Sequence, residues 1–476
     1  MEEILLNDLL EKYAKCSYDE DSIKGMLVEE INKSSKKIIV LDDDPTGVQT
    51  VHDIHVYTDW SEESIRDGFL ATEKMFFLLT NSRGLTESQT IELHRTLTEN
   101  ILKVSKETGV DFLIISRGDS TLRGHYPLET KVIKEVLENS QYGTIDGEIL
   151  FPFFKEGGRY TVSDIHYVAD DGLLIPAGKT EFAGDKTFGY TSSNLSEYIE
   201  EKTGGQFKKE AVASISLESL RSMDIEGIKN KLLTIKNFNK VIVNALDYKD
   251  VEIFCIALYK AMNLGKNFLF RTAAAFVKVM GGVTYRPYLT REEMIGTEIN
   301  TGGIIVAGSH TAKTTEQLKE LEKIEKVFFI EFNSDLVIEN KLEDEVNRVL
   351  KICSNYIVNG KTVVVHTKRK LLALKNDTPD KALIRSVKIS AAVQDLVGKL
   401  NVCPSFVIAK GGITSSDIGV KALKVKKALV LGQAKPGIPV WKTGKESKFP
   451  GIPYIIFPGN VGDKTTLKEI VELLIP

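Results

Sequence analysis

Cysteine is scarce in this sequence. The 476 residues include only Cys16, Cys255, Cys353 and Cys403, and no two of them form a CxxC pair. Structural zinc sites and disulfide frameworks both depend on closely spaced or paired cysteines, so the sequence predicts neither. Scattered thiols are typical of proteins in a reducing compartment, and we therefore expect a cytoplasmic protein.

The sequence also lacks a basic surplus and a long apolar run. Its formal net charge is −4 at pH 7. Proteins that grip nucleic acid usually carry an excess of Lys and Arg, so no nucleic-acid partner is predicted. The chain starts with the acidic stretch MEEILLN, unlike a signal peptide, and no apolar run is long enough to span a bilayer. We expect no membrane association.

Three common catalytic signatures are missing. Gly178-Lys179-Thr180 and Gly360-Lys361-Thr362 resemble the end of a Walker A loop, but the glycine needed five residues earlier is replaced by Leu173 and Asn355. The dinucleotide fingerprint GxGxxG is absent, which argues against a nicotinamide-dependent dehydrogenase. No serine lies in a GxSxG context, so a hydrolase triad has no support.

What the sequence does contain is a repeated alternation of apolar strands and helices. A chain of this length needs more than one hydrophobic core. We predict a helical extension over residues 1–35, an N-terminal domain over 36–285 and a C-terminal domain over 300–476, with a Gly/Thr-rich linker at 281–303. The predicted strands are residues 36–42, 75–80, 111–116, 148–153, 240–244 and 267–270, then 303–307, 326–331, 362–367, 405–409, 428–431 and 454–457.

This alternation indicates the α/β class. Each domain is expected to contain a mostly parallel or mixed sheet flanked by helices. In such sheets ligands bind just beyond the carboxyl ends of the strands, and several predicted strands run into polar or glycine-rich turns there. We therefore expect an active site in a cleft between the two domains.

The first polar turn follows the strand at 36–42. It contains three consecutive carboxylates, Asp42, Asp43 and Asp44, and then Pro45-Thr46-Gly47. Three neighbouring carboxylates repel one another unless a cation or a hydrogen-bonding ligand offsets the charge. A solvated turn with a helix cap is the structural interpretation. The position at a strand end favours a ligand site, with Asp43 and Asp44 as candidate catalytic residues.

A second polar segment surrounds the ends of the next two strands. Its candidates for substrate binding are Arg83, Arg117, Asp119, Ser120 and Arg123. Arginine recognises a carboxylate through a planar pair of donors, so these residues suit an acidic substrate. A structural alternative is that Arg117 and Asp119 simply pair with each other.

The C-terminal half contains three glycine-bearing turns between strand and helix. The nucleotide-binding candidates in these turns are Ser309, Gly411, Gly412, Ile413, Thr414, Ser415 and Gly459. Glycines let the backbone approach a phosphate closely, and N–H groups at a helix start favour anions. Lys313 and Lys410 are further candidates for phosphate contacts. Together the turns predict one shared nucleotide site.

These motifs resemble those of the four-carbon acid sugar kinase family. The resemblance rests on residues 43–47 (DDPTG), 119–124 (DSTLRG) and 411–415 (GGITS), and on Pro436 to Pro439 and Gly459 to Gly462. It implies a kinase that uses ATP to phosphorylate a sugar acid such as threonate, erythronate or 3-oxo-tetronate. It also implies an N-terminal sugar-acid domain and a C-terminal nucleotide domain. Residues 182–194 and 442–451 are insertions relative to shorter members, which indicates a distinct subfamily.

Several points stay open at this level. We expect ATP and Mg²⁺ as cofactors, because Mg²⁺ suits phosphate oxygens, but no residues are assigned to a metal. The general base is Asp43, Asp44 or Asp119. A hydroxy-acid dehydrogenase or isomerase and a non-catalytic sugar-acid sensor are the alternatives. The sequence names neither the acid nor the reacting hydroxyl, and it leaves the oligomeric state open, a homo-oligomer included.

Overall fold

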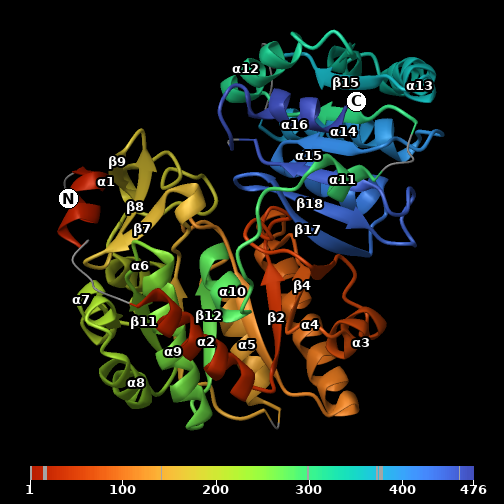
Figure 1. The fold of residues 1–476 in the computed structure, drawn as a ribbon. Helices are drawn as coiled ribbons and strands as arrows, with labels where there is room; N and C mark the ends of the chain where they lie inside the picture. Colours follow the sequence, from red (N-terminus) through yellow and green to blue (C-terminus); the bar gives the residue numbers. More distant parts are fainter. Residues whose placement is uncertain are drawn as a thin grey trace. The chain divides into compact units, whose positions relative to one another are not determined.

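The chain folds into two compact units. A computed structural model describes residues 3–13, 19–140, 142–296, 300–370, 372, 374, 379–459 and 461–475. Unit 1 comprises Met1–Gly47 and Trp60–Tyr285, and unit 2 comprises Val48–Asp59 and Arg286–Pro476 (Figure 1). The short segment at residues 48–59 is therefore part of unit 2, although it lies early in the chain.

Unit 1 is built on a parallel sheet. The strand order is β10 (Ala213–Ile215), β11 (Asn239–Val243), β6 (Gly147–Phe151), β12 (Phe268–Thr272), β5 (Phe112–Arg117), β2 (Lys37–Asp42) and β4 (Met75–Leu79), and every neighbouring pair is parallel. The inner strands are buried along their whole length. A strand that is covered on both faces has a continuous run of apolar residues. These strands could therefore be predicted from the sequence.

The helices of unit 1 flank this sheet in two groups (Figure 1). The first is α3 (Glu62–Leu70), α4 (Glu87–Thr108) and α5 (Leu128–Glu138), and the second is α2 (Glu20–Lys33), α8 (Ile225–Thr234), α9 (Tyr248–Asn263) and α10 (Ala274–Met280). Helix α4 shows how local sequence sets the ends. Thr86 and Gln89 form a reciprocal capping box at its start, and Gly109 ends it in the left-handed conformation.

A second, smaller sheet belongs to unit 1. It is antiparallel, in the order β1 (Ile4–Leu5), β9 (Leu173–Pro176), β8 (Ile165–Asp170) and β7 (Arg159–Val162). The sequence predicts helix throughout residues 1–35, whereas Ile4–Leu5 is a strand that pairs with β9. Helices α1 (Leu6–Lys12) and α2 follow it. Backbone pairing with the open edge of β9 overrides the local helical pattern here.

Unit 2 is built on a mixed sheet. Its order is β3 (Ile54–Tyr57), β17 (Lys427–Lys435), β18 (Ile438–Thr443), β19 (Pro453–Phe457), β16 (Val407–Lys410), β13 (Ile304–Ala307), β15 (Thr362–Thr367) and β14 (Val327–Phe332). The pairs from β3 to β19 are antiparallel, and those from β19 to β14 are parallel. The segment at residues 48–59 joins this unit because its strand β3 pairs with β17.

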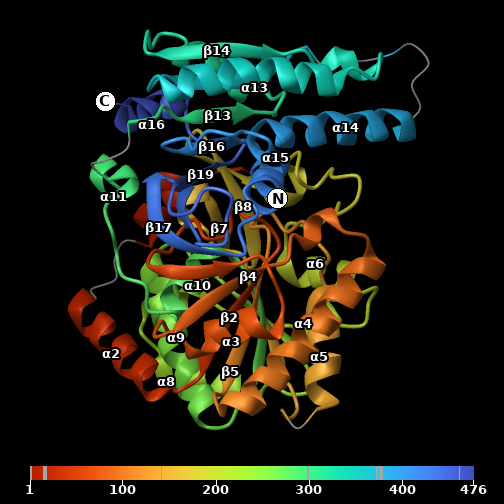
Figure 2. The same cartoon turned by 90° about the vertical axis from the view of Figure 1, so that its right-hand side faces the viewer.

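The helices of unit 2 include two long ones, α13 (Leu342–Val358) and α14 (Pro379–Gly398), which Figure 2 shows clearly. The others are α11 (Arg291–Ile295), α12 (Ala312–Leu321), α15 (Gly412–Asp417) and α16 (Thr466–Leu474). Helix α11 falls inside the stretch that the sequence predicts as linker. Within the described part of the chain, no helix is long and apolar enough to cross a bilayer. The predicted α/β class with helix-flanked sheets is confirmed.

Candidate functional site

The aspartate turn at the end of β2 is folded onto itself. Asp42 is the last residue of the strand and its side chain is fully buried. An ideal Cβ on Gly47 would stand 1.8 Å from Oδ2 of Asp42, so only glycine allows the chain to turn back this closely. Asp44 accepts hydrogen bonds from the backbone N–H of Thr46 at 2.8 Å and from its hydroxyl at 2.5 Å. The turn therefore holds its three carboxylates in different surroundings.

Asp43 combines burial with an unsatisfied oxygen. Its Oδ1 lies 3.3 Å from the Arg83 guanidinium and 3.7 Å from that of Arg117. Its Oδ2 is buried and has no hydrogen-bond partner among the described residues. Burial raises the pKa of the Asp43 carboxyl, although Arg83, Arg271 and Arg117 act to lower it. Such a carboxylate is disposed to take up a proton.

Arg83 links the aspartate turn to the next polar loop. It lies in the short 3-10 turn after β4 (Ser82–Gly84). Its guanidinium contacts Asp44 at 2.8 Å and Asp119 at 3.7 Å, in addition to Asp43. Burial by itself would raise the pKa of Asp44, but Arg83 and Thr46 outweigh it and the pKa is lowered. Asp44 is thus held as an anion.

Arg117 ends β5 and pairs across to the end of β2. Its NH1 donates to Oδ1 of Asp42 at 3.2 Å, and both side chains are almost fully buried. Burial raises the pKa of Asp42 to about 7, against the attraction of Arg117. The structural alternative raised by the sequence, a pair between Arg117 and Asp119, is not what forms.

Asp119 pairs instead with two other arginines. Its Oδ2 accepts from Nε of Arg123 at 2.7 Å, and its Oδ1 lies 3.7 Å from Arg83. Although burial alone would raise the pKa of Asp119, Arg83 and Arg123 lower it well below the usual range. The sequence candidates of unit 1, Asp43, Asp44, Arg83, Arg117, Asp119 and Arg123, therefore form one connected network.

The backbone of the loop after β5 is fixed by four buried side chains. Each donates to one of four consecutive carbonyl oxygens: His166 to Ser120 at 2.7 Å, Tyr190 to Thr121 at 2.8 Å, Tyr198 to Leu122 at 2.8 Å and Arg271 to Arg123 at 2.9 Å. Leu122 has a φ of 68°, which is costly for a residue with a side chain. We call these four donors the carbonyl clamp. They hold the loop that carries Asp119 and Ser120.

Two residues of the network were missed in the sequence. Arg271 ends in the space beside Gly118, where an ideal Cβ would stand 1.2 Å from its NH1. Its guanidinium lies 3.7 Å from Glu129, which accepts a hydrogen bond from the Ser82 hydroxyl at 2.6 Å. Both come from elements that carry no polar cluster, β12 and α5. The only sequence signal for Arg271 was Gly118. The Arg271 guanidinium fills the space in which a side chain at position 118 would lie.

In unit 2 the three glycine-bearing turns meet. They follow the neighbouring strands β13, β16 and β19. An ideal Cβ on Gly459 would lie 3.6 Å from the Ser309 hydroxyl and 3.9 Å from Cα of Gly411. Gly411 has a φ of 123°, and its ideal Cβ would lie 3.3 Å from both Ser309 and Thr414. Ser309, Gly411, Thr414 and Gly459 thus form one cluster.

Hydroxyl groups line the start of α12 beside this cluster. Thr311 is its N-cap and accepts from the backbone N–H of Thr314 at 3.3 Å. The Thr314 hydroxyl donates to that of Ser309 at 3.2 Å. Arg369, from the loop after β15, donates to the Thr315 hydroxyl at 3.0 Å. The helix start, the hydroxyls and the cation together suit an anionic group.

Lys410 stands behind the glycine cluster. Its side chain is fully buried, and its ammonium group donates to the carbonyl oxygen of Pro458 at 2.7 Å and lies 3.4 Å from that of Gly459. Burial lowers the pKa of Lys410 to about 7, with Lys313 acting in the same direction. The structure therefore makes Lys410 a support of the Gly459 turn.

The remaining candidates of this loop lie in helix α15. Ser415 is buried and donates through its hydroxyl to the carbonyl oxygen of Ala409 at 2.8 Å, so its side chain faces the sheet. Gly412 is exposed, with open space around its Cβ position. The backbone of Ile413 belongs to the helix, and its side chain lies outside the described part of the structure.

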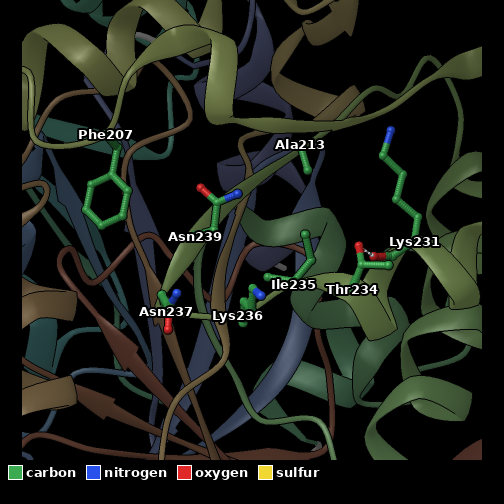
Figure 3. Close-up of a pocket in the computed structure, with 8 residues that line it drawn as sticks. All are labelled: Phe207, Ala213, Lys231, Thr234, Ile235, Lys236, Asn237 and Asn239. Atoms are coloured by element: carbon green, nitrogen blue, oxygen red, sulfur yellow. Dashed lines mark hydrogen bonds between the residues drawn. The ribbon is translucent and has the colours of Figure 1, made fainter.

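The described residues contain no group of three or more His, Cys, Asp or Glu placed to hold a metal ion. A pocket of about 460 Å³ in unit 1 is lined by residues that include Phe207, Ala213 and Asn239 (Figure 3). Ala213 and Asn239 begin β10 and β11, so this pocket lies at the amino ends of the parallel strands. The aspartate turn lies at the carboxyl ends.

Two solved structures share this fold. The chain matches a protein of Salmonella typhimurium LT2, provisionally named a tRNA synthase, with 14% identity, a TM-score of 0.65, and 91% of this chain and 98% of that one covered. It also matches a Haemophilus influenzae protein of the DUF1537 family, with 16% identity, a TM-score of 0.60, and 92% of this chain and 100% of that one covered. No curated protein sequence matches the chain.

Two domain families match the sequence itself. The sugar-binding N-terminal domain matches residues 38–280, about half of the chain. The nucleotide-binding C-terminal domain matches residues 304–467. The first match contains the Asp–Arg network and the carbonyl clamp, and the second contains the glycine cluster and α12. The chain belongs to the protein family defined by this sugar-binding N-terminal domain, which is followed here by the nucleotide-binding C-terminal domain.

Proposed function

We propose that the protein is a kinase that transfers the γ-phosphoryl group of ATP to a hydroxyl group of a small, four-carbon sugar acid. The observation that carries the proposal is Asp43, a buried carboxylate with one unpartnered oxygen, set among arginines in the sugar-binding domain. Asp44 and Asp119, the other candidates for the base, are held as anions by arginines and by hydroxyl groups. Asp43 is therefore the base in this proposal.

The chemistry assigned to Asp43 is proton removal. The carboxylate takes the proton from the reacting hydroxyl, whose oxygen forms a bond to the γ-phosphorus while the bond to the β-γ bridging oxygen breaks. The products are a phosphorylated acid, ADP and a proton on Asp43. A base works best when its pKa lies near the working pH, and burial moves the Asp43 pKa in that direction.

The nucleotide is assigned to the glycine cluster of unit 2. Backbone N–H groups at the start of α12 would donate to phosphate oxygens, and the hydroxyls of Ser309 and Thr414 lie beside Gly411, whose missing side chain lets a phosphate come close. Mg²⁺ would enter with ATP, because phosphate oxygens are the hard ligands it prefers. Phosphoryl transfer depends mainly on positioning and on cancelling phosphate charge, so both substrates must be bound before the reaction.

The direct test is ADP release with a panel of four-carbon acids, namely D-erythronate, L-threonate and the corresponding 3-oxo acid. We expect turnover with at least one acid and no turnover with ATP alone. Asp43→Asn should lower kcat by about 10²- to 10⁴-fold, the usual contribution of a general base. ATP binding measured by calorimetry should be unchanged.

The control is Asp170→Asn, which changes an exposed aspartate at the end of β8. It should leave kcat at the wild-type value. Failure to release ADP with any acid would reject the kinase. Acid binding without ATP binding would favour the sensor, and a change of NADH fluorescence on binding would favour the dehydrogenase.

A further inference from the structure

Arg159 was not singled out in the sequence, yet it stands beside the Asp–Arg network. It is the first residue of β7 in the small sheet. Its guanidinium carbon lies 5.6 Å from the centre of the Phe182 ring, and that of Arg123 lies 5.0 Å from the same ring. Phe182 thus brings together one arginine of the network and one from outside it. Cation–π contacts of this kind orient a guanidinium without neutralising its charge.

Among the described residues, the positive charge of Arg159 has no carboxylate partner. Each of the other four arginines has a carboxylate partner: Arg83 with Asp44 at 2.8 Å, Arg117 with Asp42 at 3.2 Å, Arg123 with Asp119 at 2.7 Å and Arg271 with Glu129 at 3.7 Å. Arg159 has neither an ion pair nor a side-chain hydrogen bond among the described residues. Its Nε is buried without a partner.

An unpaired guanidinium in these surroundings is unfavourable. Burial lowers the pKa of Arg159, and the nearby positive charge of Arg123 adds to this effect, while Asp119 opposes it. Arg159 is half-buried, so its charge is partly desolvated, and a bound anion can offset the free energy that this costs. The His166 ring nearby adds no charge, since burial lowers its pKa to about 4 and keeps it neutral. The missing component is an anion.

We propose that Arg159 binds the carboxylate of the acid substrate, with Arg123 beside it on the face of Phe182. The proposal deepens the function proposed above and rests on it. Arg83 and Arg117, which the sequence suggested for the acid, are already paired with protein carboxylates. For either to bind the substrate carboxylate, an existing buried ion pair would have to break. Arg159 would instead gain its first ionic partner.

The insertion at residues 182–194 then acquires a role. Besides Phe182, it supplies Asp185, which lies 3.9 Å from Arg123, and Tyr190, which belongs to the carbonyl clamp. The ring of Phe188 packs edge-on against His125, with centroids 4.8 Å apart. The insertion thus contacts the loop after β5 at several points. It therefore helps to hold the guanidinium groups of Arg123 and Arg159 beside each other.

The experiment compares binding of D-erythronate, L-threonate and the polyol erythritol, which has no carboxylate, by calorimetry in the absence of ATP. Arg159→Gln should weaken binding of the preferred acid at least tenfold and leave binding of erythritol unchanged. Arg159→Lys should recover part of the affinity, because it keeps the charge but loses the two-pronged donor geometry. ATP affinity should not change in either variant.

Arg66→Gln is the control, because Arg66 pairs with Glu107 on the surface of unit 1. It should bind the acids as the wild type does. Thermal unfolding checks that each variant is folded, and Arg159→Lys keeps the test decisive if Arg159→Gln is unstable. Wild-type affinity for the acid in a folded variant would overturn the proposal, as would equal losses for acid and polyol.

The two proposals fail in different ways. If the wild type binds an acid through Arg159 but releases no ADP, the kinase assignment fails and the carboxylate site stands. If the wild type phosphorylates an acid and Arg159→Gln keeps the same KM for it, the carboxylate site fails and the kinase stands. A wild type that binds none of the carboxylates overturns both.

Discussion

The guanidinium group of Arg271 occupies the space beside Gly118 in which a side chain would have to stand. A Cβ at residue 118 would meet NH1 of Arg271 at 1.2 Å. From this position Arg271 reaches both Glu129 and the carbonyl oxygen of Arg123. The glycine after β5 is therefore explained by a residue that lies more than a hundred positions further along the chain.

Gly118→Ala should displace Arg271 and break both of its contacts. Loss of a buried ion pair and of a hydrogen bond to a charged group should destabilise unit 1 by about 3 kcal/mol. Urea unfolding measures this loss. Gly84→Ala is the control, because a Cβ there would meet nothing within 4 Å. A stable Gly118→Ala protein with wild-type activity would contradict this account of Arg271.

The carbonyl clamp predicts a defect in acid binding rather than in ATP binding. Tyr190→Phe and Tyr198→Phe each remove one hydrogen bond to the loop that carries Asp119. Each should cost about 1 kcal/mol of stability and raise KM for the acid several-fold, with KM for ATP unchanged. Tyr142→Phe is the control, since its hydroxyl donates to the carbonyl oxygen of Phe112 at 3.0 Å, at the start of β5. Equal effects in all three variants would show that the clamp has no special role.

Gly411 and Gly412 provide a matched pair in unit 2. Gly411→Ala places a side chain on a residue whose φ is 123°, a conformation that favours glycine, and brings its Cβ against Ser309 and Thr414. ATP binding should therefore weaken about tenfold or more. Gly412→Ala places a methyl group in open space at the start of α15 and should leave ATP binding within about twofold. Calorimetry with ATP measures both. The reverse order of effects would remove Gly411 from the proposed nucleotide site.

Lys410 predicts a dependence of stability on pH. Its pKa is lowered to about 7 by burial, against roughly 10.4 in an unfolded chain. Between these values the unfolded state binds the extra proton, so the free energy of unfolding should rise as the pH rises from 7 to 10. In Lys410→Met the free energy of unfolding should not rise over this pH range. Urea unfolding at pH 7 and pH 9.5 measures the difference, with the surface variant Lys421→Met as the control for loss of a lysine.

Much of the fold could be predicted from local pattern. The inner parallel strands of both units are apolar runs because both of their faces are covered, and each predicted run overlaps a strand of the structure. The structure also contains strands that were not predicted, namely β1, β3, β7, β8, β9, β10 and β18. Most of them have four residues or fewer, and their pairing depends on which neighbour offers an open edge. Local sequence does not contain that information.

The candidate site divides in the same way. Some candidates could be recognised because they lie at or just after the end of a strand. These are Asp42, Asp43 and Asp44 at the end of β2, Ser309 after β13 and Gly411 after β16. Arg271, Glu129 and Arg159 come singly from β12, α5 and β7 and belong to no motif. The ion pairs could not be predicted from the sequence either. Several carboxylates lie near Arg117 in the sequence, and the register of β5 beside β2 is what brings it to Asp42.

The sequence by itself determined where strands end and which polar turns follow them, because hydrophobic burial and backbone geometry act over a few residues. Tertiary structure alone decided which arginine meets which carboxylate. That outcome depends on sheet order and on the depth of burial, and both are set by residues far apart in the chain. It left Asp43 with an open oxygen and Arg159 with an unpaired charge, and the two proposals depend on these features.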